Sequence, residues 1–208
     1  SDNCTTTVTM AQSPLSTATQ TGVADGGSFN VTITATDSAS NSSSCVVVVT
    51  VKDTTAPTVT AGMDVSEAVA SGCSKSIDLS TAPTTDDNCG TPTLSWSMSG
   101  ATSGAGSGAV GTYSFNVGET TITYTVTDNA GNTGTATQKV TITDGTSPTV
   151  TAASDVTINT NTDLCVSNYI VANAVYSDNC EGSTLSWALT GATTGSGTGQ
   201  VGAKDYAV

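Results

Sequence analysis

The sequence predicts an all-β protein made of tandem sandwich modules. The chain repeats itself, because Cys89 and Trp96 recur 91 positions later as Cys180 and Trp187. Several runs alternate Val or Ile with Thr, a pattern typical of strands with one buried and one wet face. Turn-forming residues separate these runs, and no helical apolar stripe of useful length interrupts them. Repetition of one folded unit normally serves length or multiplicity, so the period already favours a structural role.

Two proline-containing segments mark the boundaries between modules. Residues 52–57 read Lys-Asp-Thr-Thr-Ala-Pro, and residues 143–148 read Thr-Asp-Gly-Thr-Ser-Pro. Each segment follows one strand-like run and precedes another. Proline cannot donate to a sheet ladder, and it favours an extended residue before it, so we expect a stiff joint at each place.

These joints divide the chain into one complete module and two partial ones. The predicted divisions are residues 1–55, the C-terminal part of a module; 56–146, a complete module; and 147–208, the N-terminal part of a further module. We expect the chain to be a window from a longer array. The alternative is that half-modules of neighbouring subunits complete one another.

The complete module reads as a series of short strands. We expect strands at 64–70, 73–79, 93–98, 113–117, 121–127 and 135–143, a glycine-rich loop at 100–111 and a turn at 128–132. The run 121–127 shows the pattern best, since Ile122, Tyr124 and Val126 fall on one face and threonines on the other. Trp96 falls on the apolar face of its own run. About seven strands in a module of this size predict an immunoglobulin-like sandwich.

The composition argues against several classes of function. The chain of 208 residues has a net charge of −13, with four lysines, no arginine and no histidine. Nucleic acids and anionic membrane surfaces favour basic proteins, so neither is an expected partner. Histidine, the commonest general base and metal ligand, is missing from the chain. An active site also has no reason to recur at a fixed period, so no enzyme is expected. No apolar run approaches the roughly 20 residues of a membrane span, and no membrane insertion is expected.

The stretch 118–132 resembles the hyalin repeat (HYR). It reads Gly-Glu-Thr-Thr-Ile-Thr-Tyr-Thr-Val-Thr-Asp-Asn-Ala-Gly-Asn. An Asp-Asn-Cys segment and an indole-bearing strand precede it, and an Asp-x-x-x-Pro linker follows, so the resemblance spans the chain as one full copy and parts of two others. The chain is also similar to the Ig-like repeats of giant bacterial adhesins. The resemblance implies an extracellular sandwich of an adhesive or matrix protein, without catalytic residues.

Six cysteines predict disulfides in an oxidising, extracellular setting. A zinc site is not expected, because the chain has no Cys-x-x-Cys pattern and no histidine. A pair spaced by 16 positions in the complete module recurs with a spacing of 15 in the next, and two cysteines remain in the first unit. The bridges expected from this recurrence are Cys73–Cys89, Cys165–Cys180 and Cys4–Cys45. For Cys4, a cysteine outside the chain is the alternative partner.

Acidic residues recur at the linkers and in the turns. They are Asp53 and Asp144 in the linkers, Asp86, Asp87 and Asp178 in the Asp-Asn-Cys loops, and Asp37 and Asp128 in the last hairpin turns. Calcium takes six to eight oxygen ligands, which such segments supply as carboxylates and carbonyls. A cation at each joint would stiffen the array. The alternative is that these aspartates are ordinary turn residues, and no other cofactor is expected.

Several surface positions fit glycosylation signals. Asn30 and Asn41 lie in Asn-x-Ser/Thr triplets, as does Asn3, although such triplets arise by chance in a threonine-rich chain. Thr54 and Ser38 lie in segments that resemble a bacterial O-glycosylation signal.

Two function classes follow from the sequence. The first is a structural, non-catalytic repeat of an extracellular filament or adhesin stalk at a cell or bacterial surface, whose partners are neighbouring copies of the repeat or subunit. The second is an adhesion module that binds glycan or protein through its loops. A binding module would display aromatic platforms, whereas Trp96 and Trp187 lie at core-facing strand positions, which favours the first class.

Overall fold

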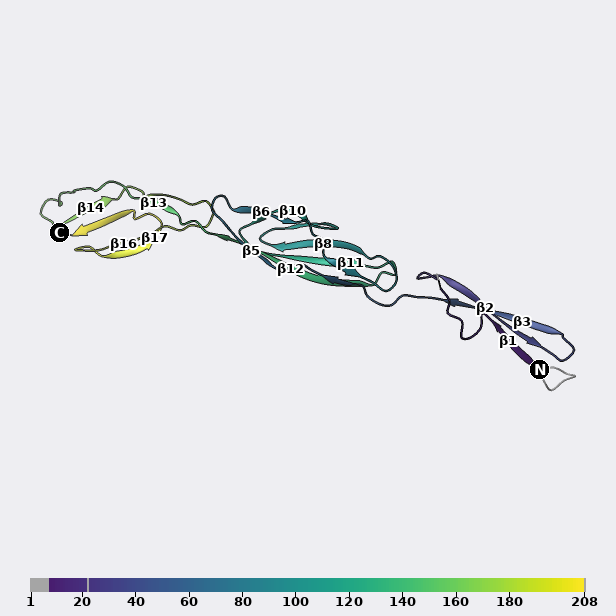
Figure 1. Ribbon diagram of the computed structural model, residues 1–208. Coiled ribbons are helices and arrows are strands. Elements are labelled where there is room, and N and C mark those ends of the chain that lie inside the picture. The colour runs from purple at the N-terminus through teal and green to yellow at the C-terminus, as the bar shows by residue number, and fades with distance from the viewer. Residues whose placement is uncertain (1–7, 22, 208) are drawn as a thin grey trace.

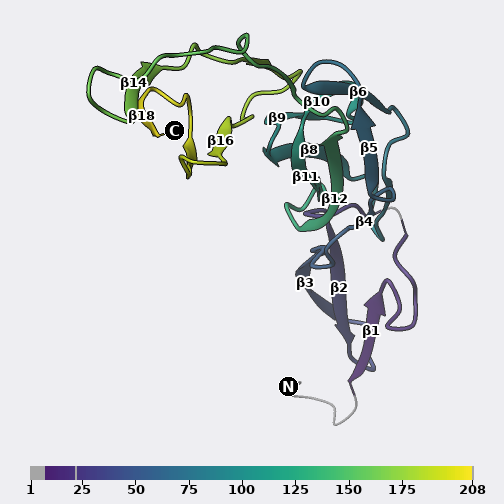
Figure 2. The ribbon, with the colours of Figure 1, turned by 90° about the vertical axis from the view of Figure 1, so that its left-hand side faces the viewer.

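The computed structural model describes residues 8–21 and 23–207 as an extended array of three groups of strands (Figure 1). Strand pairing stays within residues 9–50, 58–144 and 149–207 in this part of the chain. These residues contain strands and no helix, so the predicted all-β fold is confirmed. It follows that none of them forms a helix able to cross a membrane. Seen after a quarter turn, the third group bends away from the line of the other two (Figure 2).

The first group is a three-stranded antiparallel sheet. It consists of β1 (Thr9–Ser13), β2 (Ser28–Thr36) and β3 (Ser42–Thr50), in the order β1-β2-β3. The turn between β2 and β3 is closed by Asp37, whose carboxylate accepts the backbone N–H groups of Ala39 and Asn41, each at 2.8 Å. This Asx-type turn is a reason for aspartate at that position that needs no metal.

The central group is a two-layer sandwich. Its larger sheet has the order β5-β12-β11-β8-β9 and comprises β5 (Val65–Val69), β8 (Thr93–Gly100), β9 (Gly104–Ser107), β11 (Gly118–Thr127) and β12 (Thr133–Asp144). β5 is parallel to β12, and the other neighbours are antiparallel. Two further pairs are β6 (Ser74–Leu79) with β10 (Gly111–Asn116), and β4 (Thr58–Thr60) with β7 (Thr84–Asp86).

The core lies between these layers, where the alternating runs predict it. Ile122 and Val126 of β11 are fully buried and Tyr124 is 2% exposed, while the threonines between them are only half-buried. Trp96 of β8 is also buried, and the opposite layer contributes Phe115 of β10, which has no exposed surface. Period-2 alternation therefore places the apolar face of β11 against the facing sheet.

The glycine-rich segment predicted as a loop contains a strand. β9 pairs with β8 and sets Gly106 opposite Trp96. A Cβ built on Gly106 would lie 2.5 Å from Cζ2 of the indole, closer than side-chain carbons approach in real structures. Glycines are needed here because the indole occupies the space that a side chain would take. The glycine-rich composition of this segment therefore reflects close packing against Trp96 and not a flexible loop.

The third group repeats the first half of the central sandwich. The pairs are β13 (Thr149–Thr151) with β15 (Val175–Ser177), β14 (Val166–Ile170) with β18 (Ala203–Ala207), and β16 (Ser186–Leu189) with β17 (Gly195–Thr198). The close packing also recurs, because a Cβ on Gly197 would lie 2.7 Å from Cζ2 of Trp187. The sequence period is therefore a period of strand pairing and of core packing.

Candidate functional site at the joint

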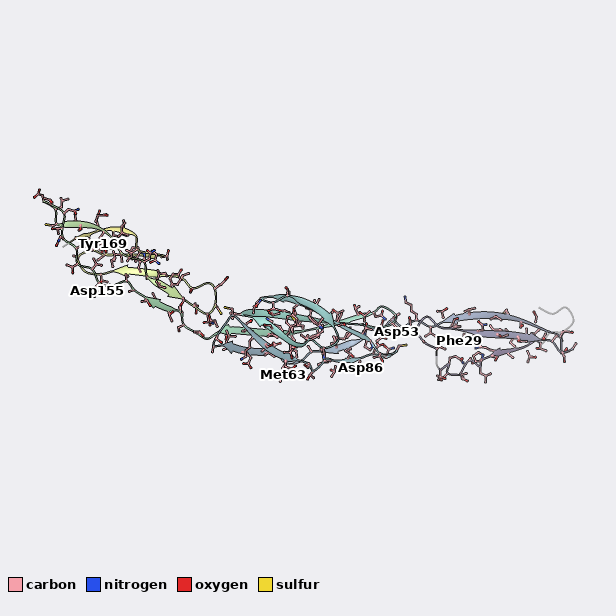
Figure 3. The ribbon with its side chains drawn as sticks, turned by 90° about the horizontal axis from the view of Figure 1, so that it is seen from above. Phe29, Asp53, Met63, Asp86, Asp155 and Tyr169 are labelled. Carbon is pink, nitrogen blue, oxygen red and sulfur yellow. The ribbon has the colours of Figure 1, made fainter. Side chains whose placement is uncertain are left out.

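Three predicted aspartates meet where the first group joins the central sandwich. Asp53 lies in the linker, Asp87 follows β7, and Asp128 lies in the turn between β11 and β12. One carboxylate oxygen from each lies within 4.8 Å of the others. Figure 3 shows Asp53 at the narrow connection between the two groups, with Asp86 of β7 near the same end of the sandwich. We call these three residues the joint carboxylates.

Asp53 is held by contacts from both sides of the joint. Its backbone N–H donates to Oδ1 of Asp25, in the first group, at 2.5 Å. Its own Oδ1 accepts the N–H of Thr55 at 3.0 Å and the side-chain amide of Asn88 at 3.4 Å. Asn132 of the central sandwich donates to its carbonyl oxygen at 3.3 Å. The linker aspartate is therefore fixed in position although it belongs to no strand.

Asp128 is buried and is kept ionised by its neighbours. Its exposed fraction is 7%, the same as that of Asp53. Burial works to raise the pKa of Asp128, but hydrogen bonds from the side chain and backbone N–H of Asn132, and from the amides of Ala130 and Gly131, outweigh it and lower the pKa. The carboxylate is thus charged at neutral pH in spite of its burial.

Asp87 supplies an oxygen that the protein leaves without a partner. Its Oδ2 accepts the backbone N–H of Cys89 at 3.2 Å. Its Oδ1 is buried and has no hydrogen-bond partner among the described residues. Buried polar atoms are nearly always paired, so an unpaired carboxylate oxygen inside a carboxylate cluster is evidence for a missing positive group.

None of the ion pairs among the described residues joins a lysine to these three carboxylates, and Lys52, next to Asp53 in the sequence, is exposed. Lys75 pairs with Glu67 at 2.8 Å and Lys139 with Glu119 at 3.0 Å. Lys204 lies over the indole of Trp187, 5.1 Å from the ring centroid. One oxygen of each carboxylate lies within 4.8 Å of the others, so like charges stand close together and a bound cation would offset their repulsion.

The remaining predicted ligands stand outside this cluster. Asp86 is the last residue of β7 and is exposed, because strand alternation turns it away from Asp87. Asp37 lies in the corresponding turn of the first group and bonds to Asn41 there. Hydrogen bonds with the side chain of Asn41, its backbone N–H and that of Ala39 lower the pKa of Asp37.

The second joint repeats part of the first. Asn179 donates to Oδ1 of Asp144 at 3.2 Å, as Asn88 does to Asp53. The backbone N–H of Thr146 and the amide of Asn179 lower the pKa of Asp144. Asp178 accepts the backbone N–H of Asn179 at 2.9 Å. The linker aspartate and the Asp-Asn-Cys loop thus meet at both joints.

The comparisons with known proteins agree with this architecture. Residues 52–142 match the model of the HYR domain. The predicted resemblance is therefore confirmed for the central sandwich, which we now call the HYR module, and it marks an adhesion-type repeat. All three joint carboxylates lie within the matched residues.

Two further comparisons add no evidence about function. No curated protein matches the chain. Among solved structures, the chain is similar to one described as "Protocadherin gammaB7 EC3-6 cis-dimer structure", with 17% identity and a TM-score of 0.35. That match covers 88% of this chain and 55% of the other, so the chain spans about half the length of that protein's chain.

The predicted Cys73–Cys89 bridge is incompatible with the structure. Cys89 lies beside the joint carboxylates, at the end of the HYR module where β12 begins. Cys73 lies at the end where β12 finishes, next to the second joint. The 12 residues of β12 span about 40 Å, whereas a disulfide needs Cα atoms within about 7 Å.

The Cys165–Cys180 bridge needs the same correction. Cys165 is exposed and directly precedes β14, a strand that lies toward the end of the third group remote from the HYR module (Figure 1). Cys180 follows β15 and lies at the second joint. Cys45 is exposed on β3, and its predicted partner Cys4 lies outside the described residues.

The predicted glycosylation positions lie on the surface of the first group and the linker. Asn30, Asn41, Ser38 and Thr54 are all exposed, and Asn41 also donates its amide to Asp37. Their glycosylation stays a prediction.

Sequence reasoning missed the residues that hold the joint together. Asp25, Asn88 and Asn132 position Asp53, yet none was singled out. For Asn88 a signal was present, because it recurs as Asn179 one period later in the same role. Asp25 gives no such signal, since it acts through one contact between segments 28 residues apart.

Proposed function

We propose that this chain is a structural, non-catalytic part of an extracellular filament or adhesin stalk whose joints are stiffened by calcium. The observation that carries the proposal is the buried Oδ1 of Asp87, which has no hydrogen-bond partner in the described part of the chain although it stands among the joint carboxylates. A repeated module joined through ordered linkers is suited to carrying length and load, and the HYR match supports an adhesion-type repeat.

Calcium is the cation that suits this site. Carboxylate oxygens are hard ligands, and calcium accepts six to eight oxygens in flexible geometry, including carbonyls and water. The joint offers three carboxylates, and the chain has no histidine. Extracellular modules typically bind calcium with dissociation constants of about 10⁻⁴–10⁻³ M, which fits a site of few ligands.

A cation at this position would fix one module against the next. Asp53 is tied to the first group through Asp25, while Asp87 and Asp128 belong to the HYR module. Ligands from both sides of a joint lose their freedom to move apart once they share one ion. The cation would therefore restrict bending between modules without being needed for the core inside each one.

The alternative of binding through aromatic loop platforms has less support. Trp96 is 9% exposed and is covered by the glycines of β9, and Trp187 is packed against Gly197 in the same way. Both indoles serve the cores of their modules.

Calorimetric titration of the chain with calcium tests the proposal. We expect binding by the unaltered chain and loss of at least about tenfold in affinity on Asp87→Asn, which keeps the side-chain shape but removes the charge. Asp86→Asn is the matched control, since it removes the same charge from the neighbouring exposed residue and should leave affinity unchanged. Absence of binding, or equal affinity in both variants, would overturn the calcium assignment.

A further inference from the structure

We propose that Cys73 and Cys180 form a disulfide across the second joint, so that consecutive modules are joined by a second covalent link in addition to the main chain. This pairing differs from the within-module bridges that the sequence period suggests. It stands independently of the calcium site, because it concerns the other joint and a different chemistry.

The two cysteines are brought together by a reciprocal set of contacts. Sγ of Cys73 donates to the carbonyl oxygen of Asn179 at 2.7 Å, and Sγ of Cys180 donates to the carbonyl oxygen of Gly72 at 3.4 Å. Each thiol thus contacts the residue that precedes the other cysteine. Asn179 also donates its side-chain amide to Gly72 at 3.0 Å, which locks the two segments side by side.

The two cysteines come from segments separated by more than 100 positions in the sequence. Each Sγ reaches the backbone next to the other cysteine, and the two thiols have no other evident reason to meet. A module surface that merely touched its neighbour would not require cysteine on both sides.

The two loops that carry these residues are held in place by hydrogen bonds. Gly72 adopts a φ of +69°, which favours glycine and turns the chain between β5 and β6 toward the joint. The N–H of Val117, just after β10, donates to the carbonyl oxygen of Cys73 at 2.9 Å, which fixes the β5–β6 loop within the HYR module. On the other side, Asn179 is bonded to Asp144 of the linker.

The bond requires oxidation, which an extracellular low-molecular-weight disulfide provides. Thiol–disulfide exchange with a reagent R–S–S–R forms the Cys73–Cys180 bond and releases two R–SH molecules, so that the two cysteines lose two electrons and two protons to the reagent. The two thiols of the chain supply the electrons, and the reagent is the acceptor. An oxidising compartment is where such disulfides form and persist.

The bridge would give the joint a second covalent connection. Tension applied between the HYR module and the third group would then pass through the β5–β6 loop as well as through residues 145–148. In a longer array the same pairing would recur at each joint, because Cys89 occupies the position of Cys180 one period earlier and Cys165 occupies that of Cys73 in the third group.

Trypsin separates the competing pairings cleanly. The four lysines are the only cleavage points, so Cys73 falls in peptide 53–75, Cys89 in 76–139, and both Cys165 and Cys180 in 140–204. The monomeric chain, oxidised in a glutathione buffer, is alkylated, digested without reductant and analysed by mass spectrometry. We expect peptide 53–75 linked to peptide 140–204, and its release on reduction.

Two single variants identify which cysteine of peptide 140–204 takes part. Cys165→Ser should keep the linked species, and Cys180→Ser should abolish it and leave Cys73 alkylated. Linkage of 53–75 to 76–139, alkylated Cys73 in the oxidised unaltered chain, or loss of the linked species on Cys165→Ser would each overturn the proposal. The Cys165→Ser result does not depend on how well Cys180→Ser folds, so the assignment stays falsifiable.

Discussion

Gly106 of β9 lies opposite Trp96 of β8, and a Cβ on the glycine would stand 2.5 Å from the indole Cζ2. We expect Gly106→Ala to destabilise the HYR module by about 1–3 kcal/mol, because the ring or the strand must move to admit the methyl group. Denaturant unfolding followed by tryptophan fluorescence measures the loss. Ala105→Ser, at an exposed position of the same strand, is the control and should change little.

A second prediction concerns the buried hydrogen bond between Tyr124 and Gln138. The tyrosine hydroxyl donates to Oε1 of Gln138 at 2.9 Å, and both residues are at most 5% exposed. Tyr124→Phe leaves that oxygen without its donor and should cost about 1–3 kcal/mol. A loss near zero in equilibrium unfolding would show that the hydroxyl contributes nothing to the core.

The same tyrosine predicts how stability depends on alkaline pH. Burial raises the pKa of Tyr124 above its ordinary value of 10.0, because the core disfavours the phenolate. A raised pKa in the folded state contributes stability that is present below pH 10 and is lost as pH rises toward the folded pKa. Unfolding free energies measured from neutral pH to above pH 10 should therefore fall more steeply for the unaltered chain than for Tyr124→Phe. Tyr113→Phe removes a hydroxyl bonded to the Ser103 carbonyl near the surface and should retain the steep fall.

Much of the fold follows from the sequence, because alternation acts locally. The apolar positions of β11 and the indole of β8 are found in the core, since a strand with period-2 alternation has one face to bury. The strand β9 escapes this reasoning, because glycines carry no apolar pattern and their role becomes visible only beside Trp96.

The joint was only partly predictable for a different physical reason. A repeat with two cysteines per module fits bridges within modules and bridges between modules equally well. The two pairings are distinguished only by the structure, in which Cys73 and Cys89 lie near opposite ends of β12. Likewise, the sequence alone does not distinguish the adjacent residues Asp86 and Asp87 as ligands. In the structure Asp86 is exposed, whereas Asp87 points into the carboxylate cluster.

Asp25 offers a test of the joint that leaves all three joint carboxylates in place. Its carboxylate accepts the backbone N–H of Asp53 at 2.5 Å. Loss of one such hydrogen bond costs about 1 kcal/mol, so Asp25→Ala should weaken calcium binding by roughly fivefold. Asp25→Asn keeps an acceptor oxygen and should bind more tightly than Asp25→Ala in the same titration. Identical affinities for these two variants would mean that Asp53 is positioned without Asp25.

If calcium stiffens the joints, small-angle X-ray scattering of the chain should change when a calcium chelator is added. We expect chelation to shorten the mean extension of the oxidised chain at constant β content, and restored calcium to reverse the change. Asp87→Asn in calcium should match the chelated state, and Asp86→Asn should not. A scattering profile of the unaltered chain that chelation leaves unchanged would contradict the stiffening of the joints by calcium.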